Sequence, residues 1–141
     1  ATLWPGGKYI TTDVIASQKF LQQYPATVKA LLQANNEAIA FLNDPANKQA
    51  SIDAAQAELK ARTGKVLTDS VIGSAWPALK FTADPLADTW KTSFIAGVNA
   101  RVLSGSLSAA DLKGIFDLRI LNGLLKAGKQ KTVSAAGLGQ Q

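Results

Sequence analysis

Apolar side chains recur along most of this chain at steps of three and four residues, which is the spacing of one face of an α-helix. The pattern predicts helices over residues 17–24, 26–43, 46–62, 68–79 and 86–103, with shorter helical starts after Ser108 and Asp117. Ser17 is a good residue for a helix start, Pro45 fits a first turn and Gly64 fits a helix end. The sequence therefore predicts a mainly α chain with one or two strands.

One segment breaks the helical spacing. Residues 9–16, YITTDVIA, are rich in β-branched side chains, which favour a strand. No later segment offers a second strand of similar length, although a strand needs neighbours for its N–H and C=O groups. We therefore expect this strand to pair with segments absent from the sequence, with a second copy that exchanges residues 1–16, or with a weak segment such as Lys80–Thr82. The lone strand indicates that the chain was cut from a larger α/β protein.

The chain contains neither a repeat nor an internal linker, and it ends in a stretch without hydrophobic periodicity. Residues 128–141 carry many small residues and are expected to be disordered. The predicted organisation has three parts. Residues 1–16 form an opening loop and strand, residues 17–127 form a helical region, and residues 128–141 form the tail.

Composition limits the chemistry. The 141 residues include no histidine and no cysteine, so histidine-dependent triads, thiolate metal sites and disulfides are excluded. Neither a phosphate-binding glycine loop nor a nucleophile elbow is present in the right context. We therefore expect a binding protein rather than an enzyme, with no metal and no cofactor.

Charge is unevenly placed along the chain, whose formal net charge is +5. Residues 1–90 are balanced, whereas residues 91–141 carry seven basic side chains against Asp111 and Asp117. One interpretation is a solvated helix face with a basic tail. The alternative is a stand-alone helical interaction domain whose basic face binds an acidic partner. Nucleic acid is not expected, because no stacking aromatic residues accompany the lysines.

Four segments, taken in order, resemble a known family. They are LWPGGKYITTDVIAS, KFLQQYPATVKALLQANNEAIAFLNDPAN, KFTADPLADTWKTS and DLKGIFDLRILNGLL. Together, from about Leu3 to about Lys126, they resemble the second half of solute-binding proteins of the nitrate/sulfonate/taurine ABC-importer family. The likeness is closest to members that take aliphatic sulfonates.

This resemblance implies the C-terminal segment of a two-lobed type 2 periplasmic-binding-protein α/β fold. Residues 1–16 would be the hinge or crossover, and residues 17–127 the helical C-terminal part of the first lobe. Members of the family extend further upstream, so the resemblance also explains a strand without partners. It implies a periplasmic or membrane-anchored extracytoplasmic protein that captures a small anion and delivers it to the permease subunits.

The crossover supplies the candidate ligand-binding residues that the resemblance implies, which are Gly6, Gly7, Lys8, Tyr9 and Thr11. Glycines permit close backbone approach to an oxyanion, lysine offers charge, and tyrosine and threonine offer hydroxyl groups. A role as hinge alone stays open for this stretch. Sulfonate, taurine and nitrate all stay open as ligands, and an enzyme of the thiamin-precursor type is a third interpretation of the chain.

Overall fold

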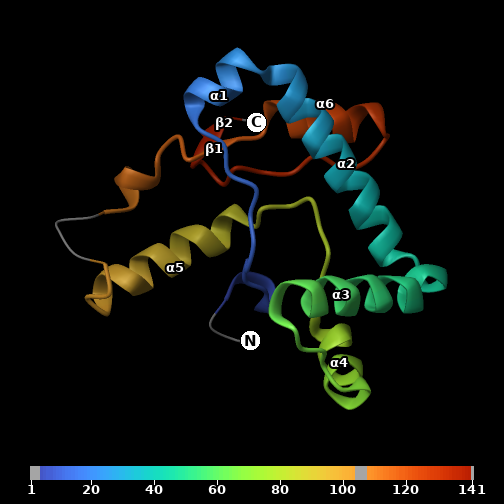
Figure 1. Cartoon of the computed structure of the whole chain (residues 1–141). Helices are drawn as coiled ribbons and strands as arrows, with labels where there is room; N and C mark the ends of the chain where they lie inside the picture. Colours follow the sequence, from blue (N-terminus) through green and yellow to red (C-terminus); the bar gives the residue numbers. More distant parts are fainter. Residues whose placement is uncertain (1–3, 104–107, 141) are drawn as a thin grey trace. The chain divides into compact units, whose positions relative to one another are not determined.

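The computed structural model describes residues 4–103 and 108–140. Its regular structure is mainly helical (Figure 1), which confirms the predicted class at this level. The α-helices are α1 (Gln18–Gln23), α2 (Pro25–Asn43), α3 (Lys48–Thr63), α4 (Asp69–Ala75), α5 (Ala87–Asn99) and α6 (Arg119–Ala127). The chain divides into two compact units, of which one comprises Ala1–Gln33 with Asp84–Gln141 and the other Ala34–Ala83.

Local signals set the helix limits where the sequence predicts them. The Ser17 hydroxyl accepts a hydrogen bond from the Phe20 N–H at 3.1 Å and caps α1. Thr68 caps α4 in the same way, through the Val71 N–H. Gly64 ends α3 in the left-handed conformation, at φ 73°. The main difference is in α5, which ends at Asn99 instead of continuing to residue 103.

The unit Ala34–Ala83 has half-buried apolar side chains but no fully buried apolar core. It contains the end of α2, the 3-10 helix η2 (Pro45–Asn47), α3, α4 and the 3-10 helix η3 (Trp76–Ala78). The Gln56 side chain exchanges two hydrogen bonds with the Leu67 backbone, at 2.6 and 2.9 Å. Ser51 is the one buried residue in this unit, and none of its apolar side chains is buried.

The other unit contains the core of the described residues. Its buried apolar side chains are Val28, Ala87, Leu112, Leu118, Leu121, Leu125, Ala135 and Leu138. Most of them belong to the 3-10 helix η4 (Ala109–Leu112), to α6 and to the segment that follows α6. The short strands β1 (Phe116–Asp117) and β2 (Gly139–Gln140) pair in parallel, with Phe116 opposite Gly139. A Cβ at position 139 would collide with the Phe116 carbonyl group, so only glycine fits this approach.

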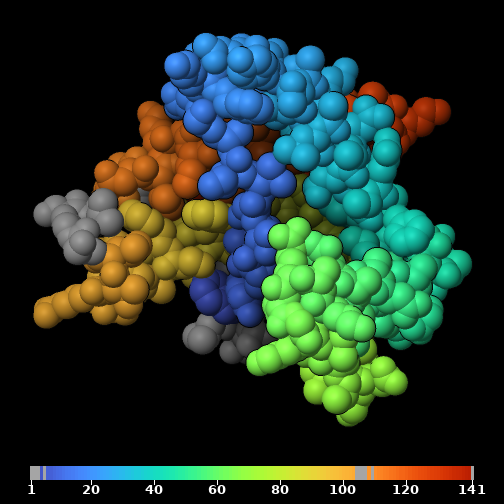
Figure 2. Space-filling model, viewed as in Figure 1, coloured from blue at the N-terminus to red at the C-terminus, as the bar shows by residue number. Residues whose placement is uncertain are grey.

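The strand predicted over residues 9–16 is wrong for this chain. These residues have no regular secondary structure, and no backbone–backbone hydrogen bond joins them to other described residues. β-Branched side chains express a preference for a pleated, half-buried surface, and the described residues supply no neighbouring strand that would make one. The segment stays at the surface, where it is visible in dark blue in Figure 2.

The expectation of a disordered tail from residue 128 is also wrong. Ala135 is fully buried and Leu138 is 6% exposed, and residues 139 and 140 form β2. In Figure 1 the segment after α6 returns to place β2 beside β1. Its small side chains, which gave no hydrophobic period, allow this close return of the backbone. Residues 1–3 and 141, which belong to the predicted opening segment and tail, lie outside the described residues.

Candidate functional site

The predicted ligand residues lie in and after the 3-10 helix η1 (Pro5–Gly7). Gly6 and Gly7 adopt φ angles of 60° and 68°, a left-handed turn that suits glycine. The Gly7 N–H donates to the Trp4 carbonyl group at 2.9 Å, so this donor is already used. Lys8, like the two glycines, is exposed. The turn therefore presents an open backbone surface and one cationic side chain.

Aromatic packing holds the start of the segment that follows. The rings of Trp4 and Tyr9 lie 5.5 Å apart at an interplanar angle of 33°. Trp4 is half-buried, whereas Tyr9 is 58% exposed and Thr11 is exposed. The structure thus brings Gly6, Gly7, Lys8 and Tyr9 to one turn, while Thr11 lies further along the unpaired segment.

A polar anchor fixes the middle of this segment to α5. The Trp90 Nε1–H donates a hydrogen bond to Asp13 Oδ2 at 2.9 Å, across 77 residues of sequence. The Trp90 ring also meets the Phe116 ring edge-on, with centroids 6.0 Å apart. Burial raises the pKa of Asp13 above its ordinary value, and the hydrogen bond from Trp90 opposes that rise. Sequence reasoning missed this contact, although the Asp13 carboxylate amid β-branched apolar residues could have indicated it.

A second polar arrangement joins α6 to the segment after it. The buried Asn122 side chain donates to the Val133 carbonyl group at 3.1 Å and accepts from the Val133 N–H at 2.9 Å. Sequence reasoning missed this clamp. The sequence feature that could have indicated the clamp is the position of Asn122 on the apolar face of a helix, four residues after Leu118 and three before Leu125.

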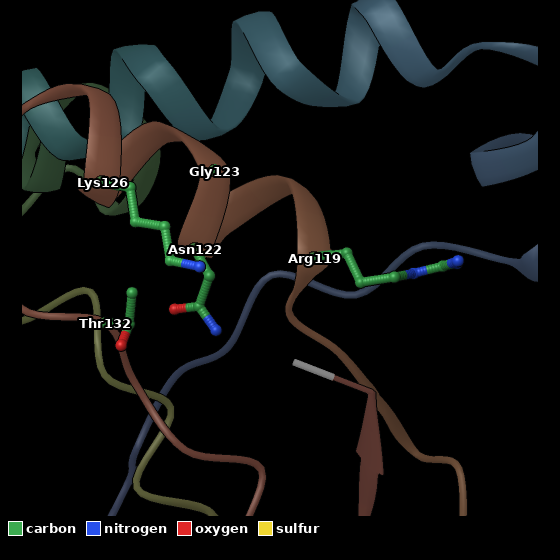
Figure 3. A pocket seen from close by; sticks show the side chains of 5 residues that line it. All are labelled: Arg119, Asn122, Gly123, Lys126 and Thr132. Atoms are coloured by element: carbon green, nitrogen blue, oxygen red, sulfur yellow. The ribbon is translucent and has the colours of Figure 1, made fainter.

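The clamp lies beside an open depression of about 250 Å³ (Figure 3). The lining residues are Arg119, Asn122, Gly123, Lys126 and Thr132. The first four come from one face of α6, and Thr132 comes from the segment across from it. This surface offers hydrogen-bond donors and positive charge.

The part of the chain that the structure describes gives no evidence of a metal site or of a membrane-spanning helix. No group of three or more histidine, cysteine, aspartate or glutamate side chains is placed to hold a metal ion there. Among the same residues, no helix has the length and apolar character needed to cross a membrane.

Comparisons of this chain with protein-family models, with curated proteins and with solved structures each found no match.

Proposed function

We propose that this chain is the helical C-terminal part of a solute-binding protein of the nitrate/sulfonate/taurine ABC-importer class. In this proposal it works in the periplasm, with a sheet that lies outside these residues, to capture a small anion and deliver it to a membrane permease. It binds and releases its ligand without chemistry. The observation that carries the proposal is the unpaired segment 8–16.

This segment has the composition of a strand, but its surroundings lack the neighbouring strands that would complete a sheet. Val14 is 54% exposed and Ile15 is 88% exposed, although both favour a packed sheet surface. The one side-chain hydrogen bond that ties the segment to other described residues is the Asp13–Trp90 anchor. Backbone N–H and C=O groups without partners form a template for an added strand. A sheet supplied from elsewhere in a longer protein would cover these groups and bury the side chains.

The turn before this segment is the proposed anion contact. Gly6 has nothing within 4 Å of where a side chain would begin, so an oxyanion can approach its backbone. Lys8 supplies a positive charge, and Tyr9 and Thr11 supply hydroxyl donors from the exposed start of the segment. A second lobe closing over this turn would exclude water from the bound anion.

Calorimetric titration with an alkanesulfonate tests the proposal. The 141-residue chain should bind with a Kd weaker than about 1 mM, because the sheet that would complete the site is missing. The product expressed together with the codons that precede Ala1 should bind at about 1 μM. In that product Lys8→Gln should weaken binding about tenfold, since it removes a charge-assisted contact, and Lys60→Gln should not. Micromolar binding by the 141 residues alone, or no anion binding by the longer product, would contradict it.

A further inference from the structure

The depression on α6 is lined by donors. Lys126 carries three N–H donors and Arg119 carries five, Thr132 offers a hydroxyl group, and no carboxylate is among the lining residues. Gly123 leaves the middle of the surface open, because nothing lies within 4 Å of where its side chain would begin. A ligand for this surface must therefore accept hydrogen bonds and carry negative charge.

Hydrogen bonds hold residues on both sides of the depression in place. Arg119 donates from Nε and Nη2 to the Asp117 carboxylate, at 2.9 and 2.6 Å, and its side chain is held pointing away from Lys126 and Thr132 in Figure 3. The Asn122 clamp on Val133 fixes the neighbouring Thr132 across from the helix. A preorganised wall loses little conformational entropy when a ligand arrives.

The charged residues around the depression are mainly positive, which suits the anionic ligand that the lining residues favour. Residues 118–140 include Arg119, Lys126, Lys129 and Lys131 and no acidic residue. Asp117 lies just before this stretch, and its ion pair with Arg119 offsets its charge. The positive potential over α6 therefore comes mainly from Lys126 and the lysines that follow it.

We propose that this depression binds a small oxyanion of the phosphate or sulfate class. Lys126 and Thr132 provide the contacts, whereas the Arg119 side chain is paired with Asp117 and points away from the other lining side chains in Figure 3. This site is separate from the proposed sulfonate turn at residues 6–11, so either assignment can fail without the other.

Amide NMR titration of the 141-residue chain with inorganic phosphate, at constant ionic strength, tests the site. The Gly123 and Thr132 amide signals should shift and saturate with a Kd on the order of 1 mM, as expected for a few charge-assisted hydrogen bonds open to water. Sulfate should act at the same residues, and sodium chloride of equal ionic strength should not.

Variants locate the contacts. Lys126→Gln should weaken phosphate binding about tenfold because it removes the positive charge, and Thr132→Val about threefold because it removes a hydroxyl donor. Lys60→Gln, an exposed lysine on α3, is the matched control and should leave the Kd unchanged. Shifts that grow linearly without saturation, equal weakening in the Lys60→Gln control, or shifts confined to residues 6–11 would overturn the assignment.

Discussion

Residues 34–83 and residues 108–140 are both mainly helical in their regular structure, yet they differ in what they bury. Residues 108–140 bury six apolar side chains around α6, whereas residues 34–83 bury none. Two asparagines show the same contrast. Asn122 makes two hydrogen bonds to one backbone residue, and the buried Oδ1 of Asn36 has no hydrogen-bond partner among the described residues. Helix formation is set locally, whereas burial needs a second surface packed against the helix.

The largest effect should come from the core around α6. Leu125 is 4% exposed, so Leu125→Ala should lower the free energy of unfolding of residues 108–140 by about 3 kcal/mol, through lost burial and a cavity. Leu79, which is 49% exposed, is the matched control in the other region, and Leu79→Ala should cost less than about 0.5 kcal/mol. Urea denaturation of both variants measures the difference, and equal costs would remove the contrast.

The two asparagines give the next largest effect. Asn122→Ala leaves the partly buried Val133 N–H and C=O groups without their side-chain partner, and should cost about 2 kcal/mol. Asn36→Ala removes an unpaired acceptor and should be neutral or slightly stabilising. Thermal unfolding followed by circular dichroism compares the pair. A large cost for Asn36→Ala would mean that its side chain already has a role in packing.

Loss of a helix cap should lower helix stability most in a helix that has few buried side chains. Thr68→Ala removes the hydrogen bond to the Val71 N–H and should destabilise α4 by about 1 kcal/mol. Because α4 buries no side chain, this loss should melt the helix locally. Carbon chemical shifts of residues 69–75 report the change, while α6 should keep its shifts. Unchanged helicity in α4 would show that packing, not its cap, holds it.

The smallest effect is the pH dependence of two aspartates with opposite shifts. The pKa of Asp117 is lowered below 3.8, chiefly by its hydrogen bonds from Arg119, so its stabilisation is present above pH 3.8 and is lost as pH falls through the lowered value. The pKa of Asp13 is raised by burial, so its contribution is present below pH 3.8 and is lost as pH rises through the raised value.

NMR titration of the two carboxyl groups checks these signs. Asp117→Asn should flatten the acid limb of the stability profile, and Asp13→Asn should flatten the limb at higher pH. If both variants change the same limb, one of the two environments is described wrongly.

Much of the helical framework could be predicted from the sequence because its signals are local. Gly64 and Thr68 act within one turn of the helix that they limit. Segment 9–16 could not be judged in the same way, because a strand depends on neighbours that the described residues do not supply. Residues 135–138 return toward α6 because their small side chains fit against it. Such small residues show no hydrophobic periodicity in the sequence. Of the candidate site, the opening loop with its two glycines could be predicted, whereas the Asp13–Trp90 bond, spanning 77 residues, could not.

Hydrogen exchange of the backbone amides in the 141-residue chain tests the central claim that segment 8–16 lacks its pairing partner. The amides of residues 8–16 should exchange at nearly the rate of an unfolded chain, those of α3 and α4 should be weakly protected, and those of α6 should be protected up to the free energy of global unfolding. Protection of residues 8–16 equal to that of α6 would mean that the segment is already paired within these residues, and would contradict the account.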